Sequence, residues 1–269
     1  MSSLTNFAQK KLLDKTLGLV DWALPTTYLA LFLSSPGESG SLASELTYGG
    51  YARVELTSKM AATVLGTGIA INNATISFAT PTTDAGTIGY WGVCDASSAG
   101  NVLLYGPLTL AWVVNSGDFP PNFVPGLFSV TMDSASSDPT QYLAKKWLDH
   151  VLGIAAYTMP TAVYLGQFTS DPGATGSLAG EMSGGGYGRQ NITSLMDATT
   201  LATGIAINND TIAFATPTAD WGTLSHHGVM DALTSGNMLL RRARAEGMSV
   251  VSGSRALQID AGSLVLRAQ

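Results

Sequence analysis

The residues best suited to chemistry are the adjacent histidines His226 and His227. An imidazole pair can bind a metal ion, but the side chains of neighbouring strand residues point to opposite faces of a sheet. This spacing therefore makes a poor two-ligand site. A second copy of the surrounding pattern, described below, has Tyr90 and Trp91 at the same positions. We interpret the pair mainly as two large side chains on a half-buried strand.

The other chemical groups are also better explained by structure. Cys94 aligns with Met230, a replacement that suits a small buried hydrophobic side chain and not a nucleophile. The GGGYG segment at residues 184–188 lacks the Lys-Ser/Thr of a phosphate loop. Four aspartates lie where turns are expected: Asp84, Asp95, Asp220 and Asp231. The sequence predicts no catalytic, cofactor-binding or metal-binding residues, no small-molecule substrate, and a protein that is not an enzyme.

An arginine-rich segment is the first candidate for contact with a partner. Arg241, Arg242 and Arg244 lie on a predicted strand, with Arg242 and Arg244 on one face and Arg241 on the other. Two interpretations stay open. The charges either protect a strand edge from pairing, or they bind an acidic protein surface through arginine forks.

A proline-rich loop, FPPNFVPG at residues 119–126, is the second candidate. Its stiffness would let Phe119 and Phe123 dock on a partner at little entropic cost, or the loop simply crosses the end of a sandwich. The predicted partner interface comprises Arg241, Arg242, Arg244, Phe119, Phe123, Trp221, His226 and His227.

The chain is a tandem duplication. At a shift of 136 residues, TGIAINN recurs letter for letter at residues 67–73 and 203–209. A unit of about 130 residues has the size of an independent domain and exceeds that of a solenoid repeat. The sequence predicts two homologous domains, residues 1–134 and 135–269, with a linker in SASSDPT at residues 134–140.

Each copy opens with a predicted helix. In the first, Thr5 or Asn6 caps the helix and Gly18 ends it; in the second, Asp138 is the cap and Pro139 takes the first helical position. Short β-branched or aromatic segments follow, separated by Gly, Pro, Asn and Asp. In the first copy these predicted strands are 27–33, 51–57, 68–71, 74–79, 87–94, 101–105, 108–114 and 124–132.

The predicted fold is therefore mainly β, with two tandem, homologous, antiparallel jelly-roll-like β-sandwich domains, each preceded by a short N-terminal α-helix. Within TGIAINN, Ile69 and Ile71 are expected on one core face, and Asn72-Asn73 in a turn. The identity of the two heptapeptides is thus attributed to core and turn.

Composition narrows the class of partner. Only 12% of residues are charged and the formal net charge is −6, which argues against nucleic-acid binding. No run of about 18 apolar residues predicts a membrane span, and the N-terminal pattern does not predict a signal peptide. With a single cysteine, the expectation is a protein made in the cytoplasm.

The motifs GGYAR or GGYGR, TISFATPT or TIAFATPT, and the following DAGT or ADWGT resemble a family of small tailed-bacteriophage structural proteins. These are often called tail-fibre proteins, and related jelly-roll proteins decorate phage heads. The resemblance is closer in the second copy, because the first has Ala85 where the second has Trp221. It implies a virion component, made in the cytoplasm of a host bacterium, with no catalytic residues.

Within that class, the leading hypothesis is a capsid decoration or cement protein. It would bind the major capsid protein on the outer surface as a pseudo-dimer and stabilise contacts between capsid subunits and neighbouring copies of itself. The alternative is a tail, tail-fibre or receptor-binding component that contacts other virion tail proteins. A second alternative is a carbohydrate-binding module with Trp91, Trp112 and Trp221 as stacking platforms.

Overall fold

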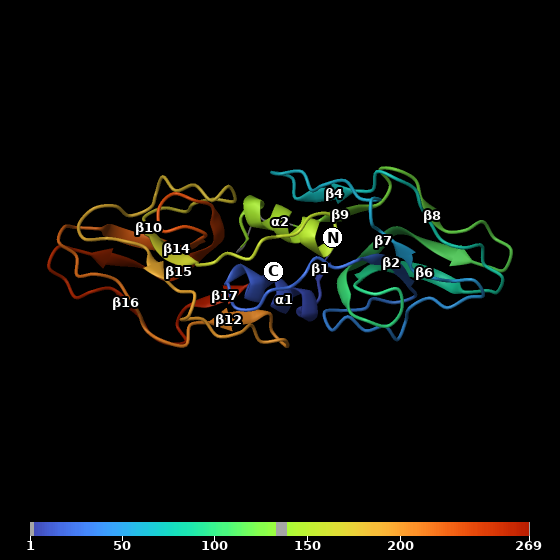
Figure 1. The fold of residues 1–269 in the computed structure, drawn as a ribbon, viewed down its shortest axis with the longest axis horizontal. Coiled ribbons are helices and arrows are strands. Elements are labelled where there is room, and N and C mark those ends of the chain that lie inside the picture. Colours follow the sequence, from blue (N-terminus) through green and yellow to red (C-terminus); the bar gives the residue numbers. More distant parts are fainter. Residues whose placement is uncertain (1–2, 133–138, 269) are drawn as a thin grey trace. The chain divides into compact units, whose positions relative to one another are not determined.

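The computed structural model describes residues 3–132 and 139–268, and these residues form two compact units. Among the described residues, unit 1 comprises 3–9, 23–132 and 145–157. Unit 2 comprises 10–22, 139–144 and 158–268. The described residues contain two helices and many short antiparallel strands (Figure 1). The predicted mainly β fold, with two tandem β-sandwich segments and their helices, is confirmed.

The two helices are α1 (Asn6–Thr16) and α2 (Gln141–Val151). Thr5 caps α1, because its Oγ1 accepts a hydrogen bond from the backbone N–H of Ala8. Thr140 caps α2 in the same way. The prediction that Pro139 is the first helical residue is wrong, since it precedes this cap; Asp138, the predicted cap, lies outside the described residues. Gly18 and Gly153 end the helices with φ angles of 73° and 70°, as the sequence predicted for Gly18.

Unit 1 is built on a five-stranded antiparallel sheet. Its order is β1 (Ser3–Leu4), β7 (Val102–Val114), β6 (Gly86–Cys94), β2 (Tyr28–Phe32) and β3 (Val54–Glu55). Two short pairs complete the unit: β4 (Ile69–Ile71) with β9 (Ser129–Thr131), and β5 (Ile76–Ser77) with β8 (Asn122–Phe123). The predicted strands 101–105 and 108–114 are one continuous strand, β7, with a register shift opposite Ile88 and Tyr90.

Unit 2 repeats this plan with a four-stranded sheet. Its order is β11 (Gln190–Asn191), β10 (Tyr164–Phe168), β14 (Gly222–Met230) and β15 (Met238–Val250). The short pairs are β12 (Ile205–Ile207) with β17 (Val265–Arg267), and β13 (Ile212–Ala213) with β16 (Gln258–Ile259). Because β14 and β15 pair in the same register as β6 and β7, residues 136 apart occupy equivalent positions in the two units.

The TGIAINN heptapeptide has a more specific role than expected. Ile71 is exposed and Ala70 is the buried residue of β4, so the prediction that Ile69 and Ile71 form the core face is wrong. The buried Asn72 instead donates through Nδ2 to the carbonyls of Ala74 and Val124, while its Oδ1 accepts from the N–H of Phe128. Asn208 makes the matching bonds in unit 2. Buried amide bonding explains the identity at this position.

Each unit also contains the end of a helix from the other repeat. In unit 1, Asp149 of α2 accepts a 2.7 Å hydrogen bond from the N–H of Thr63, and Lys145 donates to the carbonyl of Thr63. In unit 2, Asp14 of α1 accepts from the N–H of Thr199 in the same way. The compact units therefore differ from the two sequence repeats. The predicted boundary between residues 134 and 135 and most of the predicted linker lie outside the described residues.

Candidate functional site

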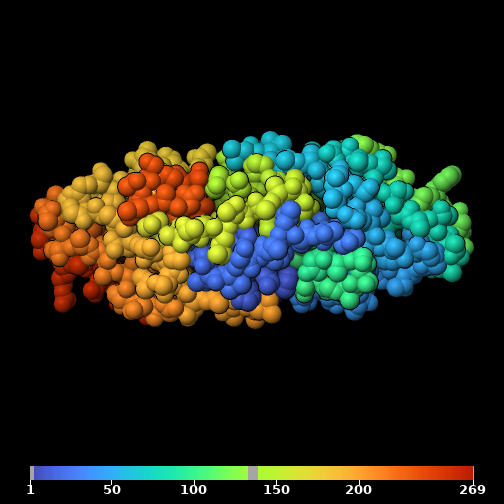
Figure 2. All heavy atoms as spheres, viewed as in Figure 1, coloured from blue at the N-terminus to red at the C-terminus, as the bar shows by residue number. Residues whose placement is uncertain are grey.

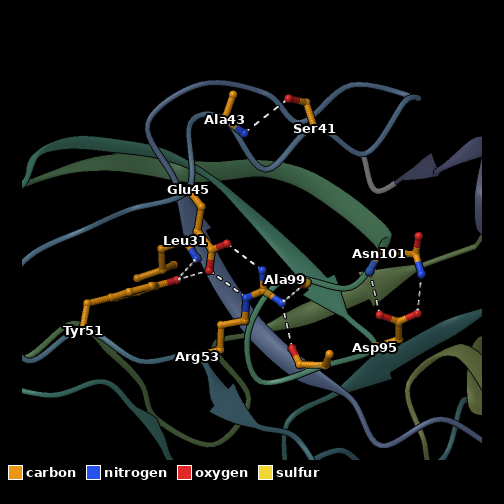
Figure 3. Close-up of polar contacts among 10 residues, drawn as sticks. Leu31, Ser41, Ala43, Glu45, Tyr51, Arg53, Asp95, Ala99 and Asn101 are labelled. Carbon is orange, nitrogen blue, oxygen red and sulfur yellow. Dashed lines mark hydrogen bonds and ion pairs between the residues drawn. The ribbon is translucent and has the colours of Figure 1, made fainter.

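The residues that look most like a catalytic cluster form a structural network. Figure 3 shows Glu45 and Arg53 paired through both carboxylate oxygens, at 2.7 and 2.6 Å. Arg53 Nη1 also donates to the carbonyls of Ala96 and Ala99, at 2.7 Å each. The Tyr51 hydroxyl donates to Glu45 and accepts from the N–H of Leu31. The cluster thereby ties the loop after β6 to the sheet.

The same network recurs in unit 2. Arg189 pairs with Glu181 and donates to the carbonyls of Ala232 and Ser235, and Tyr187 bonds to Glu181. Burial is the main cause of the raised pKa of Tyr51 and of Tyr187. Both hydroxyls therefore stay protonated and serve as fixed hydrogen-bonding groups.

Other candidate groups also have structural partners. Asp95 accepts from both the backbone and side-chain amides of Asn101, at 2.7 and 2.8 Å, which closes the loop after β6 as the turn interpretation expects (Figure 3). Burial raises the pKa of the Cys94 thiol to about 12, so the reactive thiolate is scarce. The described residues contain no group of three or more His, Cys, Asp or Glu side chains placed to hold a metal ion.

Surface chemistry, in contrast, differs sharply between the units. Around β7 and β8, unit 1 exposes five large apolar side chains, with Leu110 and Val113 on opposite sides of β7. We call this set the unit 1 face: Leu110, Val113, Phe119, Val124 and Leu127. Phe119 is 96% exposed, Leu110 73% and Leu127 61%. In the space-filling view, green atoms near residue 120 protrude from the surface of unit 1 (Figure 2). The equivalent residues of unit 2, the unit 2 face, are all exposed and polar: Glu246, Ser249, Arg255, Asp260 and Ser263.

An aromatic groove of about 430 Å³ runs beside the unit 1 face. Trp112 and Phe123 have ring centroids 5.2 Å apart, and Phe123 and Trp91 each pack edge-on against Phe128. A second hollow of about 550 Å³ lies between Trp112 and the loop that carries Phe119. Trp91 is only 6% exposed, so Trp112 is the tryptophan with an accessible surface in both hollows.

The equivalent groove of unit 2 is polar. It has a volume of about 440 Å³, and we call it the unit 2 groove; it is lined by His227, Arg244, Ala245, Glu246, Gln258, Ile259, Asp260 and Ser263. His227 replaces Trp91, and Arg244 replaces Leu108. Burial, followed by the nearby charge of Arg244, lowers the pKa of His227 to about 3, so its imidazole is neutral near pH 7.

The two histidines and the arginines separate onto two faces, as the strand alternation predicted. Arg241 donates to Asp171 at 3.0 Å, and His226 Nε2 lies 3.8 Å from the same carboxylate. Arg244 contacts His227 at 3.2 Å on the other face. A hydrogen bond from the N–H of Gly173 is the main cause of the lowered pKa of Asp171, with Arg241 and His226 contributing.

Two predicted interface residues lie inside the units. Trp221 is 2% exposed, donates through Nε1 to the carbonyl of Gly185 and packs edge-on against Tyr187. Its inclusion in a surface interface is therefore wrong, because its ring fills the core where unit 1 has Ala85. Phe123 is also buried, although it lines the aromatic groove. Phe119 remains fully available for contact, and its partner stays a prediction.

Sequence reasoning missed most of the unit 1 face and the acidic residues of the unit 2 groove. Leu110 and Leu127 look like ordinary strand and loop residues when each is considered alone. The signal that could have found them is the pairwise comparison of the repeats, in which Leu110 aligns with Glu246 and Leu127 with Ser263. A large apolar residue that becomes charged or polar at an equivalent position indicates a surface with a changed role.

Comparison with known families decides the class of protein. The family model described as podophage GP4 fiber I protein gp80 matches residues 3–131 and again residues 138–267. The chain belongs to this family. It is a phage virion structural protein with a tandem duplication, and its place is the virion. No curated protein is detectably similar to it.

The family description names a fibre and no capsid protein, so it does not support the major capsid protein as the leading partner. It supports association with other virion components. Within the described part of the chain, neither helix has the length and hydrophobicity needed to cross a bilayer.

Proposed function

We propose that this protein is a fibre component of the virion that attaches to another virion protein through the unit 1 face. The observation that carries the proposal is the chemical contrast between equivalent surfaces. Five exposed apolar residues of unit 1 are replaced in unit 2 by Glu246, Ser249, Arg255, Asp260 and Ser263. Membership in a family described as a phage fibre protein supports the same assignment.

The physical reason is the cost of leaving apolar surface in water. Burying one such side chain is worth about 1.5–3 kcal/mol, and monomeric proteins seldom keep several together on their surface. Pro120 and Pro121 stiffen the loop next to Phe119, so little conformational freedom is lost when that ring is buried in a partner. The five side chains of the unit 2 face are polar, so their burial would bring no comparable gain in free energy.

The aromatic groove gives weaker support to a carbohydrate-binding module. Of the three tryptophans considered as stacking platforms, Trp91 and Trp221 are buried, and Trp112 alone has an accessible ring. We therefore assign the face around Trp112 to protein contact. Capsid decoration differs from the fibre assignment in the partner, and a binding experiment can separate the two.

The test exchanges residues of the unit 1 face for those of unit 2. A phage carrying the double variant Leu110→Glu and Phe119→Arg should lose about tenfold or more of this protein per virion, because anchors of an interface cost about 2 kcal/mol or more when removed. Quantitative mass spectrometry of purified virions gives the copy number. Leu65→Glu is the matched control, since Leu65 is an exposed apolar residue of unit 1 outside the face, and it should keep the wild-type copy number.

Wild-type incorporation of the double variant would contradict attachment through this face. In a second arm, the purified protein is mixed with tailed virions lacking it or with tailless heads, and binding is read by sedimentation. The fibre assignment predicts binding to the tailed particles alone. Saturable binding to tailless heads would overturn it in favour of capsid decoration.

A further inference from the structure

The unit 2 groove contains a cation that has no carboxylate partner among the described residues. Arg244 Nη1 donates to Gln167 Oε1 at 3.4 Å and to His227 Nε2 at 3.2 Å, and Nη2 lies 3.4 Å from the sulfur of Met248. All three acceptors are neutral. Arg241, on the other face of the same strand, is instead paired with Asp171. A partly buried guanidinium without a counter-ion is costly, and an arriving anion would offset that cost.

Arg244 and the two side chains that it contacts through Nη1 have donors without partners. Arginine can only donate, so Gln167 must present its oxygen and His227 a bare Nε2. That arrangement leaves Gln167 Nε2, the protonated His227 Nδ1 and Arg244 Nε buried without partners. Gln167 is fully buried, so its unmade bonds are the most costly of the three. The cluster has the polarity of a site for an acceptor-rich, negatively charged group.

This polar cluster belongs to the second repeat alone. The residues equivalent to Gln167, His227 and Arg244 in unit 1 are Leu31, Trp91 and Leu108. Apolar residues thus fill the equivalent positions of unit 1, so the packing of this fold does not require polar side chains there. Burial also lowers the pKa of Arg244, which agrees with a guanidinium that lacks a stabilising charge.

The residues at the groove rim indicate which chemical groups a ligand would present besides its negative charge. Glu246, Gln258, Asp260 and Ser263 line the walls around Arg244 and supply acceptors and donors suited to several hydroxyl groups. An acidic peptide offers few hydroxyl groups to these rim residues, whereas a saccharide offers one or more on each ring. We propose that the unit 2 groove binds an acidic saccharide, with the sugar carboxylate on Arg244 and the sugar hydroxyls on the rim.

The proposal does not rest on the attachment of unit 1, so either can fail alone. The full-length protein is titrated with α-1,4-linked trigalacturonate and with neutral α-1,4-linked galactotriose in a calorimeter. These sugars differ only in a carboxylate or a hydroxymethyl group on each ring. Trigalacturonate should bind about tenfold or more tightly than galactotriose, because only its carboxylates can accept a charge-assisted hydrogen bond from the guanidinium.

Variants assign the binding to the groove. Arg244→Leu, which installs the residue of unit 1, should weaken trigalacturonate binding by about tenfold or more. Arg244→Gln should do the same and covers the case in which leucine disturbs the fold. Arg255→Leu removes an equal charge from an exposed position of unit 2 outside the groove and should leave the affinity unchanged.

Three results would overturn the proposal. One is equal affinity for the acidic and neutral sugars, or no binding of either. Another is unchanged trigalacturonate affinity in both Arg244 variants. The third is hexaglutamate binding that matches trigalacturonate and depends equally on Arg244, since the groove would then recognise acidic peptides.

Discussion

The unit 1 face and the unit 2 face occupy equivalent positions on two copies of one fold, yet they present opposite chemistry to the surroundings. Phe119 is matched by Arg255, Leu110 by Glu246 and Val124 by Asp260. The strands beneath keep the same pairing and register. After a duplication, each copy retains the residues that its own fold needs, while its surface is free to acquire a different partner.

The conserved interior shows which residues the fold needs. Glu45, Tyr51 and Arg53 recur as Glu181, Tyr187 and Arg189 with nearly identical hydrogen bonds. Bonds from a buried asparagine amide also recur at Asn72 and Asn208. Identity between the repeats at these positions therefore reflects buried polar contacts.

The largest expected effect is a loss of stability when the arginine of the buried network is removed from either unit. Arg53→Ala and Arg189→Ala each leave a poorly solvated glutamate and two loop carbonyls without their donor, and each should lower the free energy of unfolding by about 3–5 kcal/mol. Chemical denaturation followed by tryptophan fluorescence measures both. A loss below about 1 kcal/mol, or a large loss in one unit only, would break the equivalence of the two frameworks.

A smaller effect, the pH dependence of the free energy of unfolding, should distinguish the two units. The pKa of His227 is about 3 in the folded protein against the ordinary histidine value of 6.5, so the unfolded chain binds more protons between these values. Its contribution to stability is present above pH 6.5 and is lost as the pH falls toward 3, by at most about 1.4 kcal/mol per pH unit. Trp91, its counterpart, has no such titration.

His227→Gln removes the titrating ring and keeps an acceptor for Arg244. The variant should therefore show a shallower loss of stability between pH 6.5 and pH 4 than the wild-type protein, measured by denaturant unfolding at each pH. Trp91→Phe, the matched change in unit 1, should leave the wild-type slope intact. An unchanged slope in His227→Gln would mean that this histidine is not buried in its neutral form.

Much of the fold could be predicted from the sequence. The duplication, the helix ends at glycine and the strand-rich character follow from local patterns, because turn residues and β-branched residues act over a few positions. The cap of α2 was misplaced because Asp138-Pro139 is a strong local signal, whereas the structure uses Thr140. Ile71 was misassigned to the core since alternation alone cannot show that Asn72 is the buried side chain.

The candidate sites could be predicted less well, because they depend on tertiary register. The aromatic groove combines Trp91 of β6, Trp112 of β7, Phe123 of β8 and Phe128, which precedes β9. The first two approach each other only once β6 and β7 pair with the shift near Ile88. Arg244 was found as a charged residue, but its contact with Gln167 joins residues 77 positions apart. No local sequence pattern predicts a contact between residues so far apart in the chain.

The central claim is that the unit 1 face, and not the equivalent unit 2 face, binds another virion protein, and hydroxyl-radical footprinting of intact virions tests it most directly. The reactivities of Phe119 and Leu127 are compared between the free protein and the assembled particle, together with those of Arg255 and Met248 around the unit 2 face. The account predicts strong protection of Phe119 and Leu127 in the virion and little change at Arg255 and Met248. Equal protection of both faces, or protection of the unit 2 face alone, would contradict it.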